Sequence, residues 1–157
     1  MEKEITYEEA LLRMESLCVA AEHCSHDVRA KMEKLGISAP SIDKAIAHLT
    51  AERYIDEGRF AQAFTRDKLR FNHWGPYKIA QSLRMLGIRD EDIRQGLECV
   101  AEEEYAGVLR LVMEQKNRQL RDEDPYVRRC KLVRHAASRG FGTDAAMREA
   151  ERITEST

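Results

Sequence analysis

The stretch YIDEGRFAQAF, from Tyr54 to Phe64, decides the fold, because a short break separates two segments that both have a helical pattern. Large apolar side chains flank the break at Asp56–Gly58, and apolar residues recur three and four positions apart along nearly the whole chain. This is the periodicity of amphipathic helices. Alternating runs of Val, Ile and Thr and Asn-Gly hairpins are missing, so strands are not expected. The sequence therefore predicts an all-α protein in which Asp56–Gly58 joins two helical units.

A glycine follows a predicted helix three times at a nearly constant interval. Gly36, Gly87 and Gly140, in the sequences KLGI, MLGI and SRGF, are 51 and 53 residues apart. Glycine is favoured there because the residue that ends a helix often needs a positive φ, which costs glycine least. A shift of 51 residues also aligns apolar positions, for example Val28 with Ile79. The repeat predicts tandem copies of one unit.

Each copy is expected to form three short helices, which divides the chain into units at 1–55, 56–102 and 103–157. One such unit buries too little apolar surface to offset about 1 to 2 kcal/mol of backbone entropy per residue. Stacking solves this, because each interface between neighbours stabilises both units. We expect the junction of the first two units to be built from Tyr54, Asp56, Gly58, Phe60 and Phe64.

Several residues mark where the predicted helices begin. Ser25, Asp90 and Thr143 are the expected N-caps, since short polar side chains accept hydrogen bonds from the first free N–H groups of a helix. Pro76 suits a first helical turn, where its missing N–H would have no partner.

Composition indicates an ordinary soluble protein. The chain has 157 residues, of which 43% are hydrophobic and 34% charged, and its longest apolar runs are far shorter than a membrane span. The beginning MEKEITYEEA has no apolar stretch behind basic residues, so no secretory signal is expected. We expect a cytoplasmic protein without a membrane partner.

The cysteines give little support for a metal site. Four are scattered without Cys-x-x-Cys spacing: Cys18, Cys24, Cys99 and Cys130. In a reducing compartment they are expected to act as small apolar residues. The alternative is a zinc site made from Cys18, Cys24, His23 and His26. On one helix these side chains would point in different directions, so no metal is predicted.

No motif for catalysis is found. Glycine-rich nucleotide loops, His-Glu-x-x-His and Gly-x-Ser-x-Gly are all missing from the sequence. The acidic runs RDEDI and AEEEY suit helix N-termini, where the macrodipole favours negative charge. We therefore predict no catalytic residue, no cofactor and no small-molecule substrate.

Charge is segregated along the chain, although the net charge is only -2. One basic group contains Arg59, Arg66, Lys68, Arg70, Lys78 and Arg84, and a second contains Arg128, Arg129, Lys131, Arg134 and Arg139. Such a pattern indicates faces matched to a charged partner, although basic residues on exposed helix faces are also commonplace. Trp74 lies within the first group and is expected to pack between helices, with an exposed interface anchor as the alternative.

The motifs resemble those of the RecX family, bacterial regulators of the RecA recombinase. The resemblance rests on YIDEGRFAQAF, on the pattern R.K.R...WG..KI...L...GI from Arg66 to Ile88, and on RR.KLVRHAASRGF near the end. It covers about Ala10 to Ile153 and implies an elongated, curved module of three tandem three-helix repeats. It also implies binding to the RecA–DNA filament, across neighbouring subunits, and restraint of its ATPase and strand-exchange activities without catalysis.

Two sets of residues follow from the matched motif as hypotheses. Asp56, Arg59 and Phe60 would hold the junction. The basic residues and Trp74 would face the partner: Arg59, Arg66, Lys68, Arg70, Trp74, Lys78, Arg84, Arg128, Arg129, Arg134 and Arg139.

Contact with DNA itself is expected to be weak. The acid-rich segment LECVAEEEY lies between the second and third units, where phosphates along a continuous DNA track would meet carboxylates. The alternative function is a helix-turn-helix-like DNA-binding module. A third possibility is a structural adaptor for an unrelated helical assembly.

Overall fold

The computed structural model describes residues 4–121 and 124–156. Within these ranges the chain forms nine helices and no strand. They are α1 (Tyr7–Ala20), α2 (Ser25–Lys34), α3 (Ala39–Ala51), α4 (Glu57–Asn72), α5 (Pro76–Met85), α6 (Asp90–Glu98), α7 (Glu102–Gln119), α8 (Pro125–Ser138) and α9 (Thr143–Glu155). The all-α prediction is confirmed.

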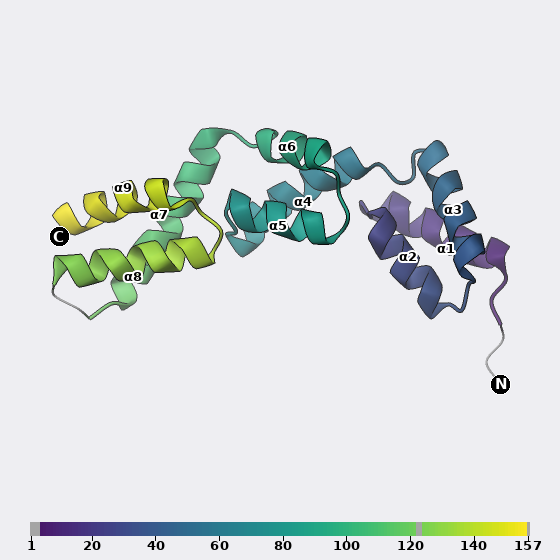
Figure 1. Cartoon of the computed structure of the whole chain (residues 1–157), viewed down its shortest axis with the longest axis horizontal. Coiled ribbons are helices and arrows are strands. Elements are labelled where there is room, and N and C mark those ends of the chain that lie inside the picture. The colour runs from purple at the N-terminus through teal and green to yellow at the C-terminus, as the bar shows by residue number, and fades with distance from the viewer. Residues whose placement is uncertain (1–3, 122–123, 157) are drawn as a thin grey trace.

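The helices follow one another in three groups of three along one long axis (Figure 1). The two ends of the chain lie at opposite ends of the molecule, and both end groups lie lower than the middle one in this view. The protein is therefore an elongated, curved arch, as the family resemblance implied, and it is built from the tandem units that the repeat predicted.

Three separate hydrophobic clusters fill the arch. The first lies among α1, α2 and α3, the second among α4, α5 and α6, and the third among α7, α8 and α9. Tyr105 and Val108 of α7 also pack against the second cluster, and Cys24, directly before α2, is fully buried in it. The first unit thus contributes a side chain to the core of its neighbour.

The three repeated glycines end equivalent helices in the same way. Gly36, Gly87 and Gly140 have φ values of 80°, 77° and 94°, the left-handed region that glycine adopts at least cost. The residue after each glycine donates a backbone hydrogen bond to the last helical turn, which is the Schellman arrangement. These bonds are Ile37 to Met32 at 3.2 Å, Ile88 to Leu83 at 3.1 Å and Phe141 to Ala136 at 3.1 Å.

Three predicted N-caps were wrong by one residue. Ser25, Asp90 and Thr143 are each the first residue of their helix, and the caps are Cys24, Arg89 and Gly142, none of which makes a side-chain cap hydrogen bond. The Ser25 hydroxyl instead donates a hydrogen bond to the Glu57 carboxylate. Asp90 instead joins an acidic first turn, where the helix dipole favours negative charge.

The predicted break at Asp56–Gly58 begins earlier in the structure. Glu57 and Gly58 already belong to the first turn of α4, and Asp56 caps it by accepting a hydrogen bond from the Arg59 N–H at 2.9 Å. The connection to the preceding helix runs from Glu52 to Asp56. The chain turns there with Arg53 at a φ of 62°.

Candidate protein-interaction surface

The first junction, between the α1–α2 loop and the start of α4, is made mainly by side chains. The Glu57 carboxylate accepts hydrogen bonds from the N–H and the hydroxyl of Ser25, at 2.9 and 2.8 Å. The Arg59 guanidinium donates to Glu22 at 2.8 Å and to the carbonyl of Arg53 at 3.0 Å. The hydrogen bond to Glu22 raises the pKa of Arg59. This junction therefore depends on complementary polar groups.

The expected junction residues divide between the two units. Tyr54 packs against the first cluster, whereas Phe60 is buried in the second cluster and Phe64 packs against it. From the α1–α2 side the junction is made by Glu22, Cys24 and Ser25, none of which was expected there. Their partners on α4 include Arg59, which was assigned to the junction, and Glu57. The sequence signal of the three loop residues is weak, because a polar loop before a helix has many possible partners.

The second junction, between the start of α5 and the α8–α9 turn, is made by the backbone. The N–H of Gly75 donates to the Arg139 carbonyl at 2.7 Å, and the N–H of Tyr77 donates to the Gly140 carbonyl at 2.9 Å. A Cβ on Gly75 would lie 2.5 Å from the carbonyl carbon of Gly140. The close approach therefore requires glycine on both sides.

Trp74 lies beside the second junction and packs into the protein. Its ring meets that of Phe64 edge-on, with centroids 6.4 Å apart, and packs against the second cluster. Lys68 Nζ lies 5.0 Å and Lys78 Nζ 4.7 Å from the centroid of the same ring, within reach of cation–π attraction. We call Phe64, Lys68, Trp74 and Lys78 the tryptophan corner. This corner brings together three residues that the sequence predicts to face the partner: Lys68, Trp74 and Lys78.

Other basic residues of the middle unit that were predicted to face a partner make contacts within the protein instead. Arg70 makes two hydrogen bonds to Glu104, at 2.7 and 3.2 Å, and these raise the pKa of Arg70 and lower that of Glu104. Arg84 lies 3.4 Å from Asp90. Arg66 donates to the Cys99 sulfur at 3.6 Å. The charges of Arg70 and Arg84 are thus largely balanced.

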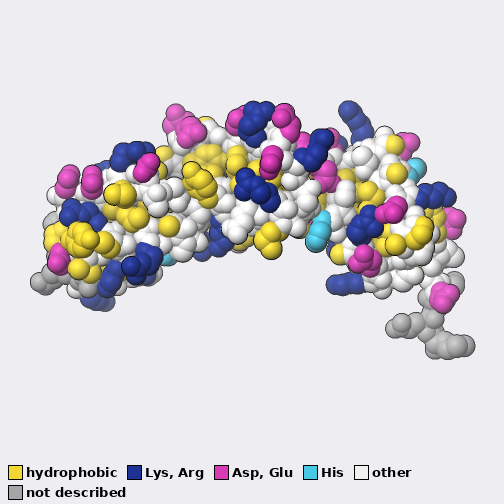
Figure 2. Space-filling model, in the orientation of Figure 1, with side chains coloured by type: hydrophobic (Ala, Val, Ile, Leu, Met, Phe, Trp, Pro, Cys, Tyr) yellow, Lys and Arg dark blue, Asp and Glu magenta, His cyan; other side chains and the backbone are white. Residues whose placement is uncertain are grey.

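The second basic group follows α8, and in Figure 2 the Lys and Arg side chains gather along the lower edge of the end occupied by α8. Arg128 donates to Asn117, and the guanidinium of Arg139 donates to the Asn72 carbonyl across the second junction. Arg134 is exposed and Arg129 is partly buried. Over the rest of this face, basic and acidic side chains alternate.

The structure divides the eleven predicted partner-binding residues by location. Lys68, Trp74 and Lys78 come together, with Arg139 on the other side of the same junction. Arg59 lies at the first junction. The remaining residues occupy separate positions on α4, α5 and α8: Arg66, Arg70, Arg84, Arg128, Arg129 and Arg134. A single continuous basic track is therefore not formed by the set.

The described residues contain no cluster suited to a metal ion and no helix suited to spanning a membrane. They contain no group of three His, Cys, Asp or Glu side chains able to hold a metal ion, and within them no helix is both long and apolar enough to cross a bilayer. Cys18 and Cys24 are buried and Cys99 and Cys130 are exposed. The expected role as small apolar residues therefore holds for the first two. Burial raises the pKa of the Cys24 thiol to about 12, as expected of an inert core thiol.

These features define a tandem array of three-helix units. Side chains join the first unit to the second, and backbone hydrogen bonds together with the Arg70–Glu104 pair join the second to the third. Residues 56–97 match the family model described as RecX, second three-helix domain. A regulatory protein RecX of Prosthecochloris aestuarii is 30% identical over 121 residues, covering 76% of this chain and 77% of the relative. The chain belongs to the RecX family.

Several relatives are longer than this chain. A regulatory protein RecX of Geobacillus kaustophilus is 34% identical over 98 residues, which cover 62% of this chain but 36% of the relative. The match to that of Leuconostoc mesenteroides covers 49% of the relative. The chain thus spans half or less of the length of these two proteins.

Two solved structures have the same fold. A crystal structure of regulatory protein RecX superimposes with a TM-score of 0.81 at 19% identity, covering 96% of this chain and 72% of the other. The crystal structure of RecX from Lactobacillus salivarius gives 0.80 at 16% identity, covering 94% and 96%. The three-unit arch is therefore shared at low sequence identity.

Proposed function

We propose that this protein is a non-enzymatic cytoplasmic regulator that binds the RecA–DNA filament and restrains its ATPase and recombinase activities. Its relatives are named regulatory proteins. The proposed mode of action is differential binding, in which contacts made with one state of the filament shift its population toward that state. No catalytic residue, cofactor or small-molecule substrate enters this mechanism.

The observation that carries the proposal is the elongated arch (Figure 1). An array of units presents a long surface for the size of its chain, and such a surface suits contact with several neighbouring subunits of a filament. We assign one unit each to residues 1–55, 56–102 and 103–157, stacked along that surface.

We propose that the tryptophan corner and α8 form the contact surface within the arch. Lys68 and Lys78 both lie over a partly buried indole, and neither has an acidic partner within ion-pair distance among the described residues. Arg129 and Arg134 extend the positive charge along α8. Arg59 and Arg70 are assigned mainly to holding the arch together, because Glu22 and Glu104 of the neighbouring units already engage them. Arg84 pairs within the middle unit, with Asp90.

The test is the single-stranded-DNA-dependent ATPase of the cognate RecA, titrated with this protein. Inhibition is expected well below one molecule per recombinase subunit, with little binding to bare DNA. Lys68→Glu/Lys78→Glu should weaken inhibition at least tenfold, whereas Arg118→Glu/Arg148→Glu, an equal charge change in the third unit, should leave it near wild type. Equal inhibition by both double variants, each shown to be folded by circular dichroism, would remove the tryptophan corner from the proposal.

Binding to naked DNA, measured in parallel at two salt concentrations, distinguishes the alternative function from the filament proposal. A helix-turn-helix-like DNA-binding module would bind duplex DNA with an affinity that falls steeply as salt rises, because its phosphate contacts release counterions. An unchanged ATPase together with such binding would replace the filament proposal. Strong inhibition of the ATPase together with weak, salt-sensitive binding to DNA would agree with the filament proposal.

A further inference from the structure

The first unit leaves a groove between its first two helices. In the second and third units the opening helix packs directly on the helix that follows it, as α4 does on α5 and α7 on α8. In the first unit both α1 and α2 pack mainly on α3 instead. The space between α1 and α2 has a volume of about 640 Å³.

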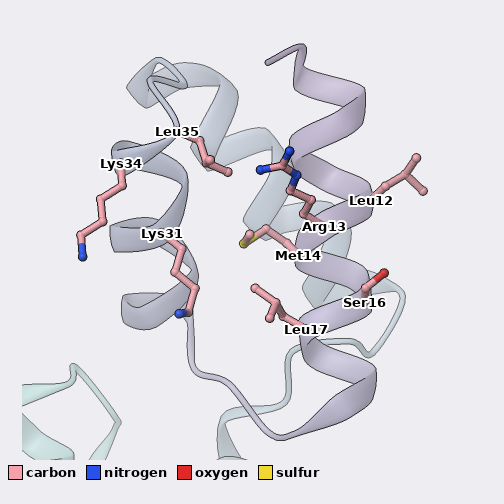
Figure 3. Close-up of a pocket in the computed structure, with 8 residues that line it drawn as sticks. All are labelled: Leu12, Arg13, Met14, Ser16, Leu17, Lys31, Lys34 and Leu35. Atoms are coloured by element: carbon pink, nitrogen blue, oxygen red, sulfur yellow. The ribbon is translucent and has the colours of Figure 1, made fainter. Parts of the chain in front are cut away.

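The lining of this groove is apolar along its length and basic at its edges. Figure 3 shows Met14 and Leu17 directed from α1 toward α2, with Leu35 at the end of α2 facing them. Met14 is only 2% exposed and lies beneath the groove as part of the first hydrophobic cluster, whereas Leu17 and Leu35 are partly exposed. The groove therefore offers apolar surface that the protein itself does not cover.

Three cations lie beside the apolar lining. Arg13 reaches from α1 into the space between the helices, and Lys31 lies on α2 at the edge of that space (Figure 3). Lys34 follows on α2, with its side chain directed away from α1. Among residues 4–121 and 124–156, none of the three has an acidic side chain within ion-pair distance. This differs from Arg59, Arg70 and Arg84, which all have one.

We propose that this groove binds one amphipathic helix of another protein, with an apolar stripe on one side and acidic residues beside it. Apolar side chains spaced at i, i+3, i+4 and i+7 are the usual anchors of a helix in a groove. Acidic residues flanking that stripe would complement Arg13, Lys31 and Lys34. The ten residues of α2 correspond to about 15 Å, so the groove holds about three turns of such a helix. This site is separate from the tryptophan corner and does not depend on the filament proposal.

A designed peptide pair tests the proposal on the full chain. One labelled peptide of about 14 residues carries Leu at the anchor positions and Glu beside them, and the second carries Lys in place of each Glu. Fluorescence anisotropy should show binding of the acidic peptide and at least tenfold weaker binding of the basic one. Amide chemical shifts of the labelled protein should change along α1 and α2.

Variants then locate the contact. Lys31→Glu/Lys34→Glu should weaken binding of the acidic peptide at least tenfold, and Leu17→Trp, which fills the groove, should weaken it while leaving the charge unchanged. The control Arg118→Glu/Arg148→Glu makes the same charge change in the third unit and should bind as wild type. Equal loss in the control, or chemical shift changes outside α1 and α2, would overturn the proposal.

Light scattering tests whether a second copy of this chain occupies the groove instead. If the groove holds another copy of this chain, the wild-type protein will be a dimer that Lys31→Glu/Lys34→Glu converts to a monomer, and the proposal of a foreign helix is then wrong. A wild-type monomer that binds the acidic peptide in the groove supports it.

Discussion

Gly75 and Gly140 meet backbone to backbone at the second junction. The N–H of Gly75 donates to the carbonyl directly before Gly140 at 2.7 Å, and the Gly140 carbonyl accepts from Tyr77 at 2.9 Å. A Cβ on Gly140 would also collide with Lys78. Gly140 is thus restricted twice, by its positive φ and by its neighbours.

The first prediction separates these two restrictions. Gly36→Ala and Gly140→Ala both place alanine in the left-handed region, at a cost of about 1 to 2 kcal/mol. Gly36 has no atom within 4 Å of its added Cβ, so that variant should lose little more than this. Gly140→Ala should lose at least about 2 kcal/mol beyond it, because packing is also disrupted. Urea unfolding measures both, and equal losses would contradict the close contact.

The second prediction concerns the hydrogen bonds at the first junction. Glu57→Ala removes the acceptor of both the N–H and the hydroxyl of Ser25. It should lower the free energy of unfolding by about 1.5 to 3 kcal/mol, as for hydrogen bonds to a charged group. Hydrogen exchange at the Ser25 amide should also become faster.

A control for this change is available on an exposed helix face. Among the residues that the structure describes, Glu91 pairs only with neighbours on its own helix, Arg94 and Gln95. Glu91→Ala should therefore change stability by no more than about 0.5 kcal/mol. If the two variants lose the same stability, the Ser25–Glu57 contact does not hold the junction.

The third prediction is a coupling between Lys78 and Trp74. A double-mutant cycle with Lys78→Met and Trp74→Leu should give about 0.5 to 1 kcal/mol, the usual size of an exposed cation–π interaction. Lys44, which lies over Tyr7 in the first unit, serves as the control. Lys44→Met and Trp74→Leu should be additive, and a similar coupling in both cycles would argue against the specific contact.

The fourth prediction is a pH dependence from His135 on α8. Burial, then the charges of Lys116 and Arg139, lower the pKa of its imidazole below the ordinary value of 6.5. The folded state thus favours the neutral ring, so this stabilisation is full above pH 6.5 and is lost as the pH falls through the folded pKa. His135→Gln should reduce that loss, measured by urea unfolding between pH 7.5 and about pH 5.

A direct measurement checks the cause of this shift. Titration of His135 by NMR should give a pKa below that of an unfolded peptide. Lys116→Gln should raise it, because one of the two nearby positive charges is removed. A wild-type pKa at or above 6.5 would exclude His135 as the source of the pH dependence.

Periodic features of the sequence predicted the fold well. The spacing of Gly36, Gly87 and Gly140 depends on backbone geometry that each unit needs for itself, and all three adopt the expected positive φ. Helix starts were less accurate, since Ser25 and Thr143 can serve either as caps or as first residues. The choice depends on partners elsewhere, such as Glu57 for Ser25.

The candidate surface was predicted less completely than the fold. The sequence marked where basic residues occur, but not which of them an acidic residue of the same chain would engage. Arg70 and Glu104 are 34 residues apart and meet only because α4 and α7 pack together. The uncovered groove between α1 and α2 likewise depends on how the helices pack, and local sequence patterns do not predict this packing.

The two junctions constrain how such a chain can diverge. At the second junction the central contact is backbone to backbone and depends on Gly75 and Gly140. The side-chain bonds between the same two units, Arg139 to Asn72 and Arg70 to Glu104, add to it. At the first junction Ser25 and Glu57, like Glu22 and Arg59, must change together or be lost together. Related proteins with different side chains there should keep the angle between their second and third units, while the direction of the first unit drifts from one lineage to another.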